Sequence, residues 1–547
     1  MGPVSVGVAA LLMTVAASLG GQDTGAAEWR MTRLDLDVTV ERATAALRLT
    51  GSARIVANRP ATRLAMGVNS RKAVMQFDHL EAVGARATMP VAGPDALRVA
   101  TLSFGSTVAA GDTVTVTFGV HSTDSSSQLV VQDAIALASW VEMWYPAPLS
   151  DDGSLSVSAI SAPGQTTFHL PTGWRSVSNG KLASSTDANA GAVETWDVSV
   201  PVARSFAAAR YTVGKESFAG RDIAVYLLSA SPSSATSQAR VLANAISALE
   251  RRFGPYPTGG YAIAEIPEQS VGFSASSEQG FILAKSSIVS APGGNLPLFA
   301  HEAAHAWWGN RVASTGAGAQ LASESLAQYG AVIAIEALEG PAAAADFLRF
   351  SRAGYNPLQC AAGYFYIWNQ GGDKALAQLG NGRWDHDLSD AKGHWVYHML
   401  RQRVGDSVFF ATLRALDAAF AGRAMTAVDI REAFIAHAPS AAKLEIFFAQ
   451  WLDRPGAPVL DVDWTVTRYG RGMQLVVKQR QGGAPYVFAL DIAITLRDGS
   501  TIRRTLDIRE RDQSTEFNLP GWPVAVAFDP DAHLLMWRPE YGPRPEK

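Results

Sequence analysis

The chain has 547 residues, of which 48% are hydrophobic and 18% charged, and its formal net charge is −4. This composition excludes a disordered chain and predicts a large folded protein of roughly three or four domains. No long run of lysine or arginine occurs, which argues against a nucleic acid or a membrane surface as partner. The single cysteine, Cys360, cannot form an internal disulfide or a cysteine-rich zinc site. Any metal must therefore be held by histidines and carboxylates.

Residues 1–27 contain an apolar run, from Val4 to Leu19, followed by small residues. This pattern fits a secretory signal peptide better than a membrane span, so we expect a secreted or periplasmic protein. Lysine and arginine are absent before the apolar run, although a signal peptide normally begins with a positive charge. An uncleaved membrane anchor is therefore the alternative.

The segment 28–213 predicts an N-terminal β domain. Apolar residues alternate there with polar ones, which is the period of half-buried strands. The alternating residues are Leu34, Leu36, Val38 and Val40 in one stretch and Val114, Val116, Phe118 and Val120 in another.

A helical period replaces the alternation after Pro232. Apolar residues then recur three or four positions apart, and Gly254 with Pro255 ends the predicted helix. The recurring residues are Leu242, Ile246, Leu249 and Phe253. Ala-rich helical stretches continue to about residue 454, so 214–455 predicts a mostly helical domain.

Glycine and proline mark a linker at 455–458, and strands return beyond it. The residues Leu490, Ile492, Ile494 and Leu496 alternate with polar neighbours up to the turn at Asp498 and Gly499. The segment 456–547 therefore predicts a small β-sandwich.

The pattern H-E-x-x-H occurs in apolar helical surroundings as His301, Glu302 and His305. Residues four apart lie slightly more than one helical turn from each other, so both imidazoles project from one face and can reach one ion. Zinc accepts such nitrogens at about 2.0–2.1 Å. Glu302 lies on the adjacent face, where it could take a proton from zinc-bound water and hand it to the leaving amine of a peptide.

Glu324, at the start of the next predicted helix, offers a third metal ligand. A set of two histidines and one glutamate leaves a fourth coordination position for water, as in catalytic zinc sites, and predicts one zinc ion per chain. Neighbouring first-row ions could also be accepted by these ligands. The alternative is that both histidines are core residues and Glu324 is a helix cap, which would bury charge without a metal.

Further short motifs accompany these residues in a fixed order along the chain. They are Trp144–Pro146, Phe253–Pro257, Trp308–Asn310 directly after the histidines, Lys392–Gly393 and Met399–Arg401. In these motifs and in the spacing of Glu324 the sequence resembles the membrane alanyl aminopeptidases, a family of gluzincin zinc metallopeptidases. The resemblance implies a multidomain α+β fold with an N-terminal antiparallel β saddle domain, a thermolysin-like, mostly helical catalytic domain and a C-terminal β-sandwich.

The chain departs from this family in the loop that grips the free amino terminus of the substrate. The family has Gly-Ala-Met-Glu-Asn there, whereas this chain has Ser274–Glu278. The position of the family's glutamate falls on Ser277, and a shift of one residue would let Glu278 bind the amine instead. A solvated loop charge is the alternative for Glu278, so specificity for free amino termini stays open.

A second departure is Asp390, which stands where the family has the tyrosine that stabilises the oxyanion. Losing one such donor typically costs about 10²–10³ in rate. His394 lies one helical turn further on, and a protonated imidazole held by Asp390 could supply the donor. An ordinary helix-surface histidine is the alternative, and Tyr397, Tyr364 and Tyr366 are weaker substitutes.

The sequence thus predicts a zinc metallopeptidase of the aminopeptidase type that hydrolyses peptides. A membrane is expected as partner only if 1–27 is an uncleaved anchor. One alternative is a catalytically weak or inactive zinc-bearing relative that binds peptides, which Asp390 and the altered loop favour and Glu302 opposes. Another is an endopeptidase that lacks amino-terminal specificity.

Overall fold

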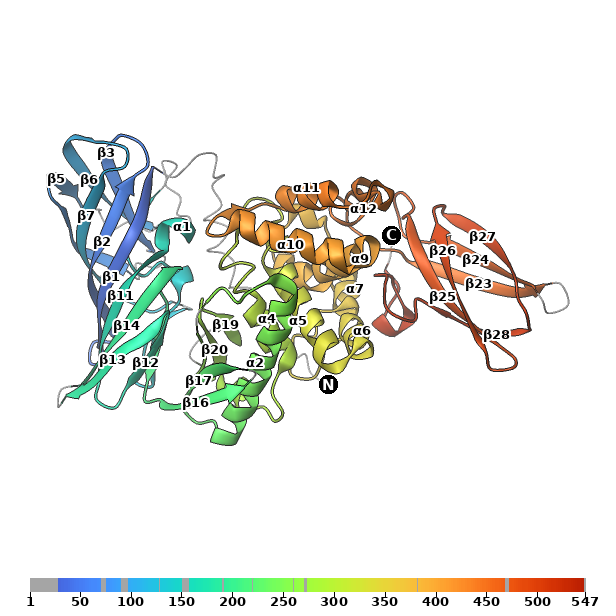
Figure 1. Ribbon diagram of the computed structural model, residues 1–547, viewed down its shortest axis with the longest axis horizontal. Helices are drawn as coiled ribbons and strands as arrows, with labels where there is room; N and C mark the ends of the chain where they lie inside the picture. The colour runs from blue at the N-terminus through green and yellow to red at the C-terminus, as the bar shows by residue number, and fades with distance from the viewer. Residues whose placement is uncertain are drawn as a thin grey trace. The chain divides into compact units, whose positions relative to one another are not determined.

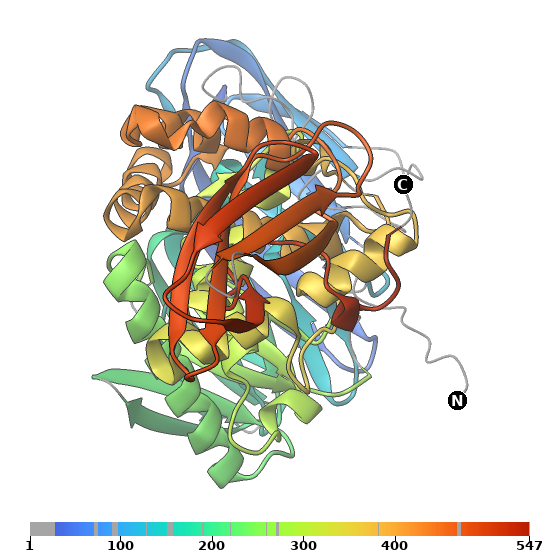
Figure 2. The same cartoon turned by 90° about the vertical axis from the view of Figure 1, so that its right-hand side faces the viewer.

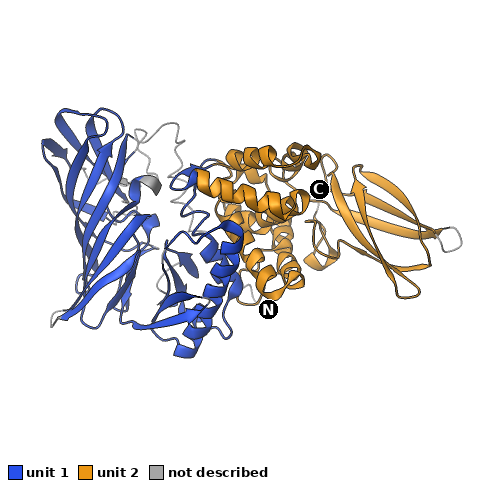
Figure 3. Cartoon of the chain, viewed as in Figure 1, with its two compact units in different colours: residues 1–316, 420–425 blue, residues 317–419, 426–547 orange. Residues whose placement is uncertain are grey.

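The computed structural model describes residues 28–545 except 70–74, 90–96, 127, 150–156, 189–190, 219, 259, 270–272, 381 and 468–471. The predicted signal peptide or anchor at 1–27 lies outside these residues. The chain forms two compact units, unit 1 with residues 1–316 and 420–425 and unit 2 with residues 317–419 and 426–547 (Figure 3). The predicted domain boundaries near 213 and 455 do not coincide with these units, and they stay a prediction.

Three sheets build the β-rich part of unit 1, drawn in blue to teal in Figure 1. Their strand orders are β13-β14-β11-β1-β2-β7-β4, β10-β3-β6-β5 and β12-β15-β9-β8. The strands are β1 Trp29–Glu41, β2 Ala46–Ala57, β3 Ala61–Asn69, β4 Met75–Ala82, β5 Ala85–Thr88, β6 Leu97–Val108, β7 Thr113–Ser122, β8 Leu129–Val131, β9 Ile135–Ala138, β10 Ala147–Pro148, β11 Ala162–Leu170, β12 Arg175–Ser178, β13 Lys181–Ala188, β14 Gly191–Val202 and β15 Phe206–Ala209. Strands β1 and β11 pair in parallel and β1 and β2 antiparallel. The predicted β-rich N-terminal part is confirmed.

Alternation in β1 produces the core of these sheets. Leu34, Leu36, Val38 and Val40 are buried, and the residues between them are partly or fully exposed. Burying one side of each strand fixes its register, because a slip of one residue would turn the apolar side chains outward. The same apolar core continues into the next sheet of unit 1 through Phe281 and Leu283.

The Trp144–Pro146 motif lies inside this core. The indole nitrogen of Trp144 donates a hydrogen bond to the carbonyl of Arg204 (2.8 Å). The hydroxyl of Tyr145 donates to the carbonyl of Ile160 (2.8 Å) and accepts from the backbone nitrogen of Arg204 (2.9 Å). The motif is therefore structural, since its polar atoms satisfy buried backbone groups.

A five-stranded sheet with the order β16-β17-β18-β20-β19 follows in unit 1. Its strands are β16 Thr212–Phe218, β17 Arg221–Leu227, β18 Tyr261–Ile266, β19 Ala275–Ser277 and β20 Phe281–Lys285. Helix α2 (Pro232–Phe253) packs against β16, β17 and helix α4 (Leu296–Ala304). Strands β18 and β20 escaped the sequence analysis, because they are short, almost wholly buried runs without alternation.

Helices dominate the first part of unit 2. They are α5 Glu324–Glu339, α6 Pro341–Arg349, α7 Ala361–Asn369, α8 Asp385–Leu388, α9 His394–Val404, α10 Asp406–Phe420, α11 Ala427–His437 and α12 Leu444–Trp451, with a π-helical turn at Ser389–Gly393 between α8 and α9. Arg401 on α9 is buried and binds Glu336 of α5 (2.5 Å) and Asp406 of α10 (2.8 Å). This arginine therefore links three helices, and the predicted helical region is confirmed.

The C-terminal part of unit 2 consists of two three-stranded sheets, drawn in orange to red in Figure 2. One sheet contains β23 Leu460–Thr467, β24 Gly472–Gln479 and β27 Asp512–Asn518, and the other β25 Phe488–Leu496, β26 Thr501–Ile508 and β28 Pro523–Phe528. The predicted alternation is present in β25, where Leu490, Ile492, Ile494 and Leu496 are buried. Among the described residues, no helix is both long and apolar enough to cross a membrane.

Two buried histidines on α9 make the stability of unit 2 dependent on pH. Burial lowers the pKa of His394 to about 4 and that of His398 to about 3, from an ordinary value of 6.5. The unfolded chain takes up these protons near pH 6.5 while the folded chain does not, so acid favours unfolding. We expect the free energy of unfolding to be unaffected by these groups above pH 7 and to fall by about 2 kcal/mol per histidine at pH 5.

Denaturant unfolding of the wild type and of His394→Leu between pH 7.5 and pH 5 measures this loss. The variant should lose less stability on acidification than the wild type. The exposed His437, replaced by glutamine, is the matched control and should not change the slope. Equal slopes for His394→Leu and the wild type would contradict the assignment of a neutral, buried imidazole.

Candidate metal centre

Helix α4 presents the H-E-x-x-H motif. Its first turn is capped by Asn295, whose side-chain oxygen accepts a hydrogen bond from the backbone nitrogen of Leu298 (3.3 Å), and Pro297 lies in the first turn. His305 is the C-cap residue and keeps helical backbone angles, with its nitrogen bound to the carbonyl of His301 (3.2 Å). Both histidines therefore lie on one face of the helix, although α4 ends at Ala304, one residue before His305.

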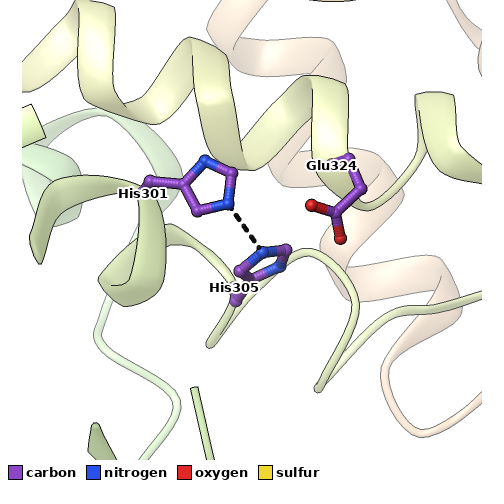
Figure 4. Close-up of side chains that lie close together, drawn as sticks. All are labelled: His301, His305 and Glu324. Carbon is purple, nitrogen blue, oxygen red and sulfur yellow. Dashed lines mark hydrogen bonds between the residues drawn. The ribbon is translucent and has the colours of Figure 1, made fainter. Parts of the chain in front are cut away.

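The two imidazoles face each other, as Figure 4 shows. The Nε2 atoms of His301 and His305 lie 3.1 Å apart, and the ring planes are inclined by 83°. The Nδ1 atom of His305 lies 2.9 Å from the carbonyl oxygen of Trp308. A proton on that Nδ1 leaves the Nε2 lone pair of His305 directed toward His301, which is the tautomer that binds a metal.

Glu324, the first residue of α5, completes a ligand set. One ligand atom from each of His301, His305 and Glu324 lies within 4.8 Å of the others, and the glutamate carboxylate points toward the imidazoles in Figure 4. Ligands at 2.0–2.1 Å from a tetrahedral zinc are spaced by about 3.3 Å, close to the separation of the two nitrogens. The residues therefore fit a zinc ion, and three protein ligands leave a fourth coordination position for water.

Glu302 is nearly buried, with 7% of its surface exposed. The hydroxyl of Tyr261 on β18 donates to the Glu302 carbonyl (3.4 Å) and lies 3.3 Å from the hydroxyl of Ser277. The side-chain nitrogen of Asn310 also donates to the Ser277 hydroxyl (3.4 Å). Ser277, at the position of the family's amine-binding glutamate, is thus linked through Tyr261 to the backbone of the motif.

Buried aromatic side chains pack around the turn that follows the H-E-x-x-H motif. Trp307 and Trp308 are fully buried, and both rings meet Phe253 edge to face with centroids 5.5 and 5.7 Å away. Tyr256 contacts Trp307 and Tyr261 in the same manner. The Phe253–Pro257 motif therefore forms part of the core beneath the histidines, which immobilises the turn that positions His305.

Glu278 lies in a polar network instead of solvent. Its side chain is fully buried, and its carboxylate accepts hydrogen bonds from the hydroxyls of Ser139 (2.8 Å), Ser205 (2.7 Å) and Ser276 (2.7 Å). Burial raises the pKa of Glu278, and the three hydroxyls oppose that rise. The interpretation of Glu278 as a solvated loop charge is therefore wrong. Its amine-binding role stays a prediction, and a substrate amine would have to compete with these three hydroxyls for the carboxylate.

His394 does not provide the protonated donor expected beside Asp390. It is fully buried, its Nδ1 contacts the backbone carbonyl of Asp390 and not the carboxylate, and burial lowers its pKa to about 4. The expectation of a helix-surface residue is also wrong. Asp390 lies in the π-helical turn at Ser389–Gly393 and His394 directly follows it, so the α-helical spacing used for the expectation does not apply there.

Two of the three tyrosines named as substitutes have hydroxyls that already donate hydrogen bonds elsewhere. The hydroxyl of Tyr397 donates to the carbonyl of Leu321 (2.8 Å), and that of Tyr364 donates to Asp373 (3.0 Å). Both rings are buried, whereas Tyr366 is half exposed. Tyr397 and Tyr364 therefore use their hydroxyls to hold the fold together.

His386 on α8 is a site residue that the sequence analysis missed. Its Nδ1 lies 3.7 Å from the Glu324 carboxylate, and its Nε2 lies 3.5 Å from the Asp390 carboxylate. Asp390 itself is fully buried and accepts a hydrogen bond from the side-chain amide of Gln359. The spacing of four residues between His386 and Asp390 is visible in the sequence and could have indicated the pair.

Comparisons with known proteins place this site on a known fold. No protein-family model matches the sequence, and no curated protein does. Solved structures do match. The aminopeptidase A of Legionella pneumophila, solved with aspartic acid, is similar over 95% of this chain and 61% of its own, with a TM-score of 0.66 and 15% identity. This chain therefore spans about three fifths of that protein's length.

The M1 zinc metallopeptidase of Deinococcus radiodurans, solved as a point mutant, is similar over 81% of this chain and 99% of its own, with a TM-score of 0.63 and 15% identity. A structure of the mutant bound to a Tyr-Ser-Ala substrate gives a TM-score of 0.60 at 17% identity. At these identities the likeness shows the fold. The chain thus has the fold of the M1 zinc metallopeptidases, with a set of potential zinc ligands within it.

Replacing Glu278 by glutamine tests the serine network. The amide offers one acceptor oxygen and places a donor group against hydroxyls, so we expect the free energy of unfolding to fall by about 1–3 kcal/mol. Glu81→Gln, at an exposed strand position, is the matched control in denaturant unfolding. Unchanged stability with a raised KM for peptides that have a free amino terminus would instead assign Glu278 to the substrate amine.

Proposed function

We propose that this protein is a zinc-dependent metallopeptidase of the M1 aminopeptidase type that hydrolyses peptides. The observation that supports it most is the pair of imidazole nitrogens 3.1 Å apart on one helical turn, with the Glu324 carboxylate beside them. The fold similarity to zinc metallopeptidases adds to this support. The proposed catalytic zinc ion is held by His301, His305 and Glu324.

The residues of the motif divide the catalytic work. When bound, zinc supplies a Lewis acid that polarises a peptide carbonyl and acidifies a water molecule. Glu302 takes the proton of the attacking water and delivers it to the nitrogen of the leaving amine. The Trp308 carbonyl holds the tautomer of His305, and the nearly complete burial of Glu302 limits the access of bulk water to its carboxylate.

Specificity for a free amino terminus is the finer part of the proposal. The related structures that hold aspartic acid or Tyr-Ser-Ala are consistent with sites for amino acids and short peptides in those proteins. In this chain Ser277 and Glu278 occupy the corresponding loop. An endopeptidase without this specificity is the alternative, because Ser277 carries no charge and the Glu278 carboxylate already accepts three hydrogen bonds.

Asp390 favours a second candidate function, a slow or inactive relative that binds peptides. A buried carboxylate stands where the resemblance leads us to expect a tyrosine, and His394 is a neutral histidine that does not replace it. The intact Glu302 favours the enzyme.

The remaining expectations are also proposals. We place the protein outside the cytoplasm on account of residues 1–27, as a secreted or periplasmic protein or as one anchored by that segment. We assign 28–213 to a saddle-shaped β domain, 214–455 to a thermolysin-like catalytic domain and 456–547 to a β-sandwich, in keeping with the sheets and helices described above.

Turnover of fluorogenic peptides by the wild type and by Glu302→Gln tests the proposed function. We expect the variant to retain zinc and to lose about 10²- to 10⁴-fold in rate, because the general base is removed. Chelation should abolish wild-type turnover. The matched control is Glu432→Gln, an exposed position on α11, which should behave as the wild type.

Paired peptides with free and acetylated amino termini separate the alternatives. A preference for free termini supports an aminopeptidase, and equal rates support an endopeptidase. Zinc-loaded wild-type protein that cleaves no member of a broad peptide panel would contradict the enzyme and leave a peptide-binding protein.

A further inference from the structure

A second group of potential metal ligands lies next to the first and shares one residue with it. His386 on α8, Asp390 in the π-helical turn and Glu324 on α5 each offer a ligand atom within 4.8 Å of the others. All three belong to unit 2. Of these residues, only Glu324 belongs to the proposed zinc site.

The distances in this group are those expected between ligands of one ion. The separations of 3.5 Å between His386 Nε2 and Asp390, and of 3.7 Å between His386 Nδ1 and Glu324, exceed the usual length of a hydrogen bond. Two ligands of one tetrahedral zinc are about 3.3 Å apart, and ligands with wider bond angles are further apart. The His386 ring has one nitrogen near each carboxylate, and one ligand atom from each of the three residues lies within 4.8 Å of the others.

Charge gives an independent reason for a cation. Asp390 is fully buried and Glu324 is 5% exposed, so two carboxylates approach each other with little water between them. Like charges in such surroundings are costly unless a cation or a proton joins them. Lys392 is close in sequence, but its ammonium group lies 3.8 Å from Asp373, so it serves another carboxylate. Gln359 donates to Asp390 and holds its carboxylate in place.

We infer that His386, Asp390 and Glu324 form a second site for a divalent first-row cation such as Zn²⁺ or Mn²⁺. Glu324 can serve both ions because a carboxylate has two oxygens, and paired catalytic ions typically lie about 3.5–4 Å apart. A cation held by Asp390 would place positive charge where the family's tyrosine is missing. The inference shares Glu324 with the proposed zinc site, so the two sites are tested with separate variants.

Titration of the metal-free protein with Zn²⁺ tests the second site. The protein is stripped with a chelator, titrated calorimetrically, and then desalted for metal analysis by mass spectrometry. We expect two ions per wild-type chain, and one ion for each of His386→Gln, Asp390→Asn and His305→Gln. The exposed control His437→Gln should bind two. Circular dichroism and the unfolding midpoint identify any variant that fails to fold. If His386→Gln does not fold, the second site is judged from Asp390→Asn, which preserves the shape of the side chain.

The stoichiometries separate failure of this inference from failure of the proposed function. One ion in the wild type that is lost in His305→Gln and kept in both His386→Gln and Asp390→Asn overturns the second site and leaves the zinc peptidase intact. One ion that is lost in His386→Gln but kept in His305→Gln supports the second site and contradicts the proposed zinc site. No bound ion in folded wild-type protein overturns both.

Discussion

The Nε2 atoms of His301 and His305 lie 3.1 Å apart, so a proton or a cation must lie between them. The surrounding structure holds the two rings at this distance. The Trp308 carbonyl fixes the His305 ring, and packing of Trp307 and Trp308 on Phe253 holds the turn in place. A proton fills the place between the two nitrogens when the site holds no metal, and a zinc ion would fill it in the proposed enzyme. In the proposed enzyme, zinc binding would therefore be coupled to the stability of the surrounding turn.

Local periodicity explains why much of the architecture and the ligand set could be predicted from sequence. The alternation of Leu34, Leu36 and Val38 indicates a strand because one face of that strand is buried. His301 and His305 likewise share a face because α-helical geometry is the same in every protein. The strands β18 and β20 gave no such signal, because both of their faces are buried and their residues do not alternate.

Residues whose role depends on distant segments could not be predicted. Glu278 is buried because Ser139 and Ser205, far away in the sequence, supply hydroxyls for its carboxylate. Asp390 lies in a π-helical turn that ends just before His394, and no local pattern in the sequence predicted this turn. The approach of His386 to Glu324 depends on how α8 and α5 pack, which spacing along the chain does not reveal. The concentration of negative charge around Glu324, on which the second cation site depends, is therefore a property of the tertiary structure.

Diffraction data recorded at the zinc absorption edge, on crystals grown with zinc, would test the central claim most directly. Our account predicts a strong anomalous peak within about 2.0–2.2 Å of His301 Nε2, His305 Nε2 and a Glu324 oxygen. Full-length protein crystallised with zinc that showed no peak there, or a peak coordinated only by other residues, would contradict it.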